Sequence, residues 1–247
     1  MSETSEPSYP RTALTRVRRH PERGRYDEAA VHAVLDAALM AHVGYLIDGR
    51  PVVTPTLFWR AGRRLFWHGA AASRMLKTVA EGTPVCVTVT LMDALILATS
   101  GFHHSMNYRS VMAFGHARPI EDAADKRAAA DAFIERIYPG RAATLRPPTE
   151  LELQTTSFVT MEIEEASAKV REGGVAPLDI DEGWPAWSGV IPLETRLGAP
   201  VADGSLGARA MGLATPPPHP AGTRLDELLA AAAQATAVEA TAPLTPA

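Results

Sequence analysis

The sequence predicts a mainly β fold, a small antiparallel barrel with a few added helices. Two observations support this prediction: β-rich runs follow one another through tight turns, and helical patterns occur only near the start and in two of the connections. A chain of 247 residues, 46% of them hydrophobic, is long enough to bury a substantial core without disulfides. We therefore expect one main domain, residues 26–194, with a flanking segment at each end.

The first 25 residues mix proline, serine, arginine and glutamate without periodicity, so we expect a flexible arm. Arg16, Arg18 and Arg19 could make it a contact arm, although a solvated tail is the simpler interpretation. A helix is expected next, because Asp27 is suited to cap its N-terminus and apolar residues then recur at helical spacing: Val31, Val34, Leu35, Ala38 and Leu39.

Three β-rich runs follow, at residues 43–48, 51–60 and 64–69, and tight turns containing Gly49 and Gly62 join them into a meander. A short helix is expected from Ser73 to Gly82. Residues 84–91 then alternate cleanly, and one face of this strand holds Val85, Val87, Val89 and Leu91.

The second half continues the β pattern. We expect strands at residues 94–100, 108–120 and 157–170, a polar loop at 101–107 and a helix at 122–138. From residue 195 onward, large apolar residues are few and turn formers many, so residues 195–247 are expected to be a disordered tail rich in proline and alanine, with a brief helix at 224–235.

Composition excludes several classes of function. The formal net charge is only −4, so no global charge indicates binding to nucleic acid or to an anionic membrane. Cys86 is the single cysteine, which fits a reducing compartment, and no apolar stretch has the length of a signal or membrane-spanning segment, so we expect a cytoplasmic protein. The motifs G-x-G-x-x-G, G-x-x-x-x-G-K-[ST], H-E-x-x-H and G-x-S-x-G are all missing from the sequence.

One motif indicates an anion site. A strand ends at His68-Gly69, and Ser73 can cap the helix that opens with Arg74 and Lys77 on one face. A hydroxyl, a guanidinium and an ammonium that converge in this way suit a phosphate monoester. A solvated basic helix at the surface would give the same pattern, so spacing alone leaves both interpretations open.

Two further stretches could belong to the same site. Residues 54–56, Thr-Pro-Thr, interrupt a β run with a proline, which marks an edge or a bulge and leaves backbone groups free for a heterocycle, or only protects the edge from aggregation. In the strand 108–120, Tyr108 and Ser110 share one face, while Arg109 lies on the other and needs an anionic or carbonyl partner if it is buried.

Taken in order, these pieces resemble the pyridoxamine 5'-phosphate oxidase-related superfamily of FMN-binding split barrels, and most closely its flavin-nucleotide-binding, nitroimidazole-reductase-like branch. The resemblance rests on "VVTPTLFWR", "RLFWHGAAASRMLK", "VCVTVT", "HHSMNYRSVMAFGHARPI" and "TSFVTMEIEEASAKVREG", and it covers roughly residues 20–190. It implies an antiparallel six-stranded split β-barrel and a homodimer with FMN at the subunit interface.

The resemblance also implies a role for each matching residue. Thr54, Pro55 and Thr56 would lie along the flavin ring, Ser73, Arg74 and Lys77 would hold the phosphate, and four residues would complete the pocket: Asn107, Tyr108, Arg109 and Ser110. His68 stands where vitamin B6 oxidases tend to have tyrosine, which argues against that activity, and we assign it as a catalytic proton donor. FAD, deazaflavin F420 and haem also occur in the superfamily, so FMN is inferred by analogy.

Two functions remain in competition. One is a flavin-dependent, nitroreductase-like oxidoreductase that reduces a small organic acceptor, with NAD(P)H as a transient donor. The other is a non-catalytic flavin- or haem-binding protein for storage, sensing or haem handling, with His68, His103 or His104 as the axial ligand of a haem. His103, His104 and His116 have no recognisable ligand spacing, so no metal-ion site is expected.

Overall fold

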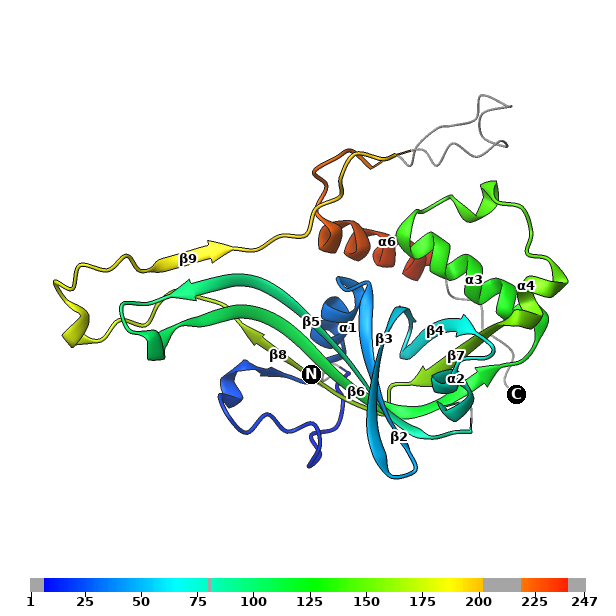
Figure 1. The fold of residues 1–247 in the computed structure, drawn as a ribbon, viewed down its shortest axis with the longest axis horizontal. Coiled ribbons are helices and arrows are strands. Elements are labelled where there is room, and N and C mark those ends of the chain that lie inside the picture. Colours follow the sequence, from blue (N-terminus) through cyan, green and yellow to red (C-terminus); the bar gives the residue numbers. More distant parts are fainter. Residues whose placement is uncertain (1–6, 80, 202–218, 240–247) are drawn as a thin grey trace, which may run out of the picture.

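The computed structural model of the protein describes residues 7–79, 81–201 and 219–239. Its centre is a ring of six antiparallel strands in the order β6-β7-β4-β3-β2-β5, closed by the pairing of β5 with β6 (Figure 1). The strands are β1 (Gly24–Arg25), β2 (Met40–Ile47), β3 (Arg50–Ala61), β4 (Arg64–Ala70), β5 (Pro84–Leu97), β6 (Ser105–Ile120), β7 (Thr156–Glu162), β8 (Glu165–Arg171) and β9 (Gly189–Pro192). The predicted six-stranded antiparallel barrel is confirmed.

The helices lie outside the ring: α1 (Glu28–Asp36), α2 (Arg74–Val79), α3 (Ala123–Ile137), α4 (Glu150–Thr155) and α6 (Leu225–Glu239). Asp27 caps α1 as predicted, and its carboxylate accepts a hydrogen bond of 2.8 Å from the backbone N–H of Ala30. Val31, Val34 and Leu35 are buried against the barrel core. None of the described helices is long and apolar enough to cross a membrane.

A second, smaller apolar cluster lies on the outside of the barrel. Trp59, Phe66 and Phe158 project outward from β3, β4 and β7, and α3 covers them with Ala129 and Phe133. α6 lies beside α3 and packs against both α3 and α1 (Figure 1). Three helices, α1, α3 and α6, therefore pack together on this side of the molecule.

The β2–β3 hairpin turns through Asp48 and Gly49, whose φ angles are 50° and 74°. Two successive positive φ values are typical of the tight turns that match strand twist, and Gly49 adopts them without steric cost. The predicted meander of β2, β3 and β4 is confirmed by its antiparallel ladders.

The structure corrects two strand boundaries. Residues 84–97 form one strand, and Asp93 bulges between Met92 and Ala94 where two separate strands were expected. Conversely, the expected strand 157–170 is two strands, because β7 pairs with β4 and the end of β6, whereas β8 pairs with the middle of β6 and with β1. The chain changes partners beside Gly115, where an added Cβ would lie 2.2 Å from the carbonyl oxygen of Glu162.

The prediction of a flexible N-terminal arm is wrong for residues 7–25. Tyr9 is 2% exposed, its hydroxyl lies 2.8 Å from Nε2 of His32, and the guanidinium of Arg63 lies over its ring. Thr15 is 1% exposed, and β1 adds to the sheet beside β8. These contacts join segments far apart in sequence, so local composition gave no sign of them. Residues 1–6 lie outside the described residues.

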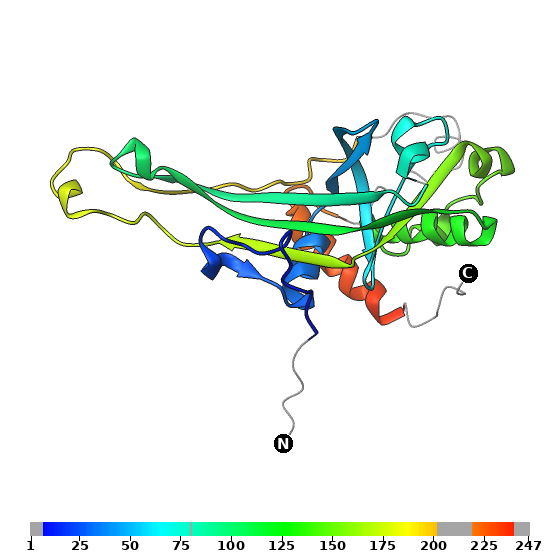
Figure 2. The ribbon, with the colours of Figure 1, turned by 90° about the horizontal axis from the view of Figure 1, so that it is seen from below.

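The outer halves of β5 and β6 leave the barrel as a long two-stranded hairpin, and β9 pairs with β5 along Ala94–Leu97 (Figures 1 and 2). β9 was not predicted. The brief helix expected in the C-terminal tail is confirmed as α6 and is longer than expected, whereas residues 202–218 and 240–247 of that tail lie outside the described residues.

Candidate functional site

The barrel is split between β3 and β4. Their ladder joins only Phe58–Ala61 to Arg64–Trp67, so in the described structure the rest of β3, residues 50–57, pairs with β2 alone. Pro55 lies on this open edge, where its missing N–H removes no hydrogen bond from a neighbouring strand. The prediction that the proline marks a strand edge is confirmed. Backbone groups on this edge are free to contact a ligand.

Thr54 and Thr56 face the interior side of this edge, since they pair with the buried residues Ala41 and Val43 of β2. The hydroxyl oxygen of Thr54 lies 3.1 Å from that of Tyr45, and the Thr56 hydroxyl donates to the carbonyl oxygen of Leu57 over 3.2 Å. Both threonines remain partly exposed. They therefore present hydroxyl groups beside the split.

The helix α2 follows directly after β4, at the split. The carbonyl oxygen of Ser73 accepts the first helical hydrogen bond, 3.1 Å from the backbone nitrogen of Lys77, which places Ser73 at the N-cap. α2 buries its apolar face, residues Met75, Leu76 and Val79, and leaves Arg74 and Lys77 exposed. Neither cation forms an ion pair with any described residue, so both are available to an anion.

His68 lies one residue beyond the last rung of the β3–β4 ladder. Its ring packs against Trp59, Phe133 and Phe158, with centroid distances of 6.0, 5.0 and 5.3 Å. Burial lowers the pKa of His68, so the imidazole is neutral at pH 7. Its Nδ1 is buried and has no hydrogen-bond partner among the described residues, which is an unusual state for a ring nitrogen.

Three of the four predicted residues 107–110 in β6 already have side-chain partners. Asn107 donates to the carbonyl oxygen of Gly173 and accepts from Arg171, while Ser110 donates to the carbonyl oxygen of Lys169. Tyr108, between them, is partly buried. These contacts tie the hairpin to β8 and to the loop that follows it.

Arg109 has the anionic partner that its position requires. Its guanidinium lies 2.6 Å from a carboxylate oxygen of Asp93, in the β5 bulge, and 3.1 Å from one of Asp226, in α6. These carboxylates raise the pKa of Arg109. Arg109 therefore joins the hairpin to the C-terminal helix, and the geometry gives it a structural role in the single subunit.

The predicted site residues form two separate groups. Thr54, Pro55, Thr56, His68, Ser73, Arg74 and Lys77 lie around the split, whereas Asn107, Tyr108, Arg109 and Ser110 lie on the hairpin. Pro55 of β3 pairs with His42 of β2, His42 pairs with Thr88 of β5, and Thr88 pairs with Met112 of β6, so Pro55 and Met112 are three strands apart. Arg109 lies three residues further along β6. That separation is about 14 Å across the sheet and about 10 Å along it. One subunit alone does not bring the two groups together.

Comparison with known proteins identifies the family. The family model described as pyridoxamine 5'-phosphate oxidase matches residues 27–170. The chain belongs to this family. The predicted superfamily and its split-barrel fold are thereby confirmed, and flavin is the cofactor class that the family supports.

Two solved structures of this fold resemble most of the chain. The flavocytochrome Anf3 from Azotobacter vinelandii is 37% identical, with a TM-score of 0.75 and coverage of 87% of this chain and 95% of its own. An FAD- and haem-binding protein from Mycobacterium smegmatis is 35% identical, with a TM-score of 0.74 and coverage of 82% and 98%. A 5-nitroimidazole antibiotic resistance protein from Bacteroides thetaiotaomicron is 22% identical, with a TM-score of 0.49 and coverage of 58% and 84%. No curated protein sequence matches.

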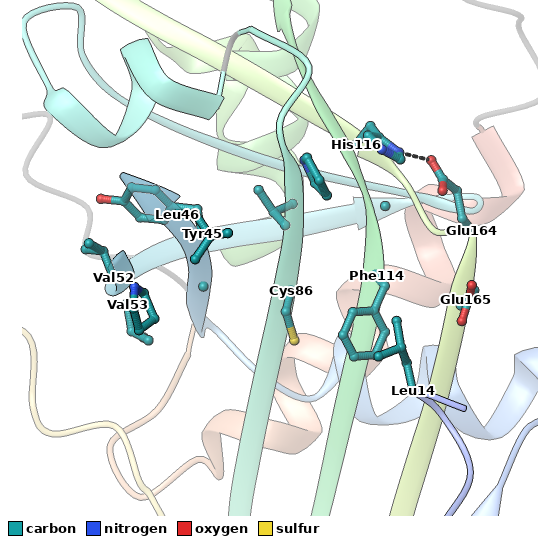
Figure 3. Close-up of a pocket in the computed structure, with 15 residues that line it drawn as sticks. Leu14, Tyr45, Leu46, Val52, Val53, Cys86, Phe114, His116, Glu164 and Glu165 are labelled. Atoms are coloured by element: carbon teal, nitrogen blue, oxygen red, sulfur yellow. Dashed lines mark hydrogen bonds and ion pairs between the residues drawn. The ribbon is translucent and has the colours of Figure 1, made fainter. Parts of the chain in front are cut away.

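The outer face of the sheet carries an apolar trough of about 430 Å³. Figure 3 shows Leu46 and Val53 from the β2–β3 hairpin on one side, Phe114 and Leu14 on the other, and Cys86 between them. The same face exposes further large apolar side chains on β2, β3 and β6: Met40, Leu57 and Met112. This surface is not predictable from the sequence, because strand alternation identifies two faces but not which of them meets solvent.

Proposed function

We propose that the protein binds a flavin nucleotide at the split between β3 and β4 and uses it to pass electrons to a small organic acceptor. The observation that carries this proposal is the open β3 edge beside Arg74 and Lys77, two exposed cations without a described acidic partner. A stable fold has no need of either feature. Together they suit a planar ring attached to a phosphate.

In this arrangement Ser73, Arg74 and Lys77 bind the phosphate, and the free edge of Thr54–Thr56 contacts the ring. A bound flavin supplies oxidation and reduction that side chains cannot perform, and the protein orients the ring and excludes water. His68 is held neutral, so it has one ring N–H proton that it can donate to a substrate undergoing reduction. The sequence has no dinucleotide-binding G-x-G-x-x-G motif, so NAD(P)H, the expected small-molecule donor, would bind only as a transient substrate.

FMN is the flavin predicted from the sequence, and the relative from Mycobacterium smegmatis supports FAD as the alternative. Both flavins have a phosphate next to the ribityl chain, so the same three residues serve either one. The choice between them depends on whether the surroundings of α2 admit the adenosine half of FAD.

A homodimer would bring the two groups of site residues together. The apolar trough and its neighbours, Met40, Leu57 and Met112, form a face that a second copy can bury. The hairpin of β5 and β6 extends beyond its own barrel (Figure 2), and in a dimer it can reach the split of the partner. Residues 107–110 of one subunit would then complete the pocket of the other.

A second candidate function is haem binding, and one specific observation favours it. The two relatives with high coverage are a flavocytochrome and an FAD- and haem-binding protein. Within this chain, His68 is a neutral imidazole whose Nδ1 has no described partner, and a neutral imidazole is what haem iron requires of an axial ligand. The protein would then combine a flavin with a haem.

The absorbance spectrum of the purified protein tests both proposals, with the ligand released by heat and identified by mass spectrometry. Flavin bands and a released mass of FMN or FAD are expected, and a Soret band that disappears in His68→Ala would establish haem ligation. A colourless protein that takes up neither added FMN nor added FAD would refute the flavin proposal.

A matched pair of variants tests the phosphate site. Arg74→Gln with Lys77→Gln should weaken flavin binding about 100-fold, because two charge-assisted contacts contribute about 3 kcal/mol together. Arg118→Gln with Arg141→Gln makes the same charge change at exposed positions on β6 and after α3, and should leave flavin affinity unchanged. Equal affinities for the two variants would place the phosphate elsewhere.

A further inference from the structure

The N-terminal segment is strongly basic in a chain that is acidic overall. Residues 11–25, which we call the basic arm, contain six arginines and one glutamate, a formal charge of +5. The whole chain has a net charge of −4, so all other residues together carry −9. A concentrated positive patch on a negative molecule is a feature that steers binding partners.

The basic arm is held in place and is not a loose tail. The backbone N–H of Val17 donates to the hydroxyl of Tyr26 over 2.9 Å, and Thr12 bonds to Glu165 of β8. Thr15, 1% exposed, anchors the turn through its hydrogen bond to the carbonyl oxygen of Pro10. The cost of ordering this surface is therefore already met before any partner binds.

Three arginines of the basic arm are free. Arg16, Arg18 and Arg19 are exposed, and none of their side chains forms a hydrogen bond or ion pair with a described residue. By contrast, Arg23 pairs with Glu22, and Arg25 donates to backbone carbonyls. A stable fold has no need of three unpaired guanidinium groups within four residues.

The basic arm also borders the apolar trough on the outer face of the sheet. Leu14, two residues before Arg16, lines the apolar trough opposite Val52 and Val53 of β3 (Figure 3). Val53 belongs to the open edge of β3, residues 50–57. A molecule bound to the arm would therefore lie across the trough from the strand that is expected to hold the flavin ring.

We propose that the basic arm is the docking surface for a small acidic electron-transfer protein that delivers electrons to the flavin. This proposal rests on the proposed function. The patch is small and the other residues together carry −9, so an extended polyanion such as duplex DNA or a lipid bilayer would meet repulsion beyond the patch. A compact acidic protein matches both its size and its charge.

The test uses an acidic [2Fe–2S] ferredoxin as the probe and the full-length chain. Its binding is measured by calorimetry at low salt and at 0.3 M salt, and the rate of flavin reduction by reduced ferredoxin is measured by stopped flow. Arg16→Gln, Arg18→Gln and Arg19→Gln in one variant should lower affinity and reduction rate at low salt by about tenfold or more. Reduction by dithionite, which needs no docking surface, should be unchanged.

The matched control carries Arg118→Gln, Arg141→Gln and Arg146→Gln, three exposed arginines outside the arm with the same total charge change. It should bind ferredoxin within twofold of the wild type. Equal losses in both variants would overturn the proposal, as would tighter binding to phosphatidylglycerol vesicles or duplex DNA than to ferredoxin. Loss of flavin from the arm variant would assign the arginines to the cofactor site instead. Calorimetry measures ferredoxin binding whether or not the protein holds a flavin. Failure of the proposed flavin function is therefore distinguished from failure of the proposed docking surface.

Discussion

The side chain of Arg136 offers a sharp test of how the C-terminal helix is held. It is 3% exposed, and its guanidinium donates to the carbonyl oxygens of Leu229 in α6, over 2.6 Å, and of Ala38, over 3.2 Å. It also bonds to the carbonyl of Asp36, the last residue of α1. One buried cation thus connects three helices.

Two opposing terms set the effect of Arg136→Met. The carbonyls of Asp36 and Ala38 lose their only described partner, at about 2 kcal/mol each, and the α1 C-terminus loses a favourable charge worth about 1 kcal/mol. Burial, however, lowers the pKa of Arg136 to about 10 from 12.5, so removing the charge returns about 3 kcal/mol. The net expectation is a destabilisation of about 2 kcal/mol, or about 4–8 °C in Tm for a chain of this size.

Thermal unfolding followed by circular dichroism measures the change in Tm, and hydrogen exchange shows whether α6 loses protection first. The control is Arg127→Met on the same helix, whose exposed pair with Glu150 should contribute less than about 1 kcal/mol. An Arg136→Met protein as stable as the wild type would refute the reasoning, since it would mean that desolvation of the guanidinium outweighs its hydrogen bonds.

Three further predictions concern single residues. Gly115→Ala should destabilise the protein by about 3 kcal/mol, because its Cβ would meet the carbonyl of Glu162 at 2.2 Å, whereas Gly174→Ala should have little effect; Tm values decide this. Val53→Glu places a charge on the proposed dimer face and should shift the protein toward monomer in sedimentation, whereas Leu151→Glu, similarly exposed on α4, should not. A Val53→Glu protein that stays as dimeric as Leu151→Glu would contradict the proposed interface. Burial lowers the pKa of His68, so the unfolded chain binds a proton below pH 6.5 that the folded chain resists. Stability present above pH 6.5 should be lost as pH falls, so the loss of Tm between pH 7.5 and 5.5 should be smaller in His68→Phe than in the wild type. An equal loss of Tm in both proteins would count against it.

Much of the fold is predictable because the signals are local. Asp27 caps α1, Gly49 allows the positive φ of a tight turn, and the alternation around Val85 separates a buried face from an exposed one. Each of these depends on contacts within a few residues. The split of the barrel was predicted only through the family resemblance, yet Pro55 marked the strand edge correctly.

The sequence indicated which residues could form the site, but not which other residues surround them in the folded chain. The sequence indicated that Arg109 needs an anionic partner, and the structure supplies Asp93 and Asp226, one from a bulge and one from a helix more than a hundred residues away. It indicated His68 as reactive, but not the cage of Trp59, Phe133 and Phe158 that keeps it neutral.

The sequence by itself determined the class of fold, the order of most strands, the capped helix and the basic turn after β4, since periodicity, turn chemistry and capping act over short distances. Tertiary structure alone decided that Tyr9 anchors the N-terminal segment, that the chain changes partners beside Gly115 and that residues 107–110 lie far from the split. These outcomes depend on packing between distant segments, where many local patterns compete for the same surfaces and only the folded chain selects among them.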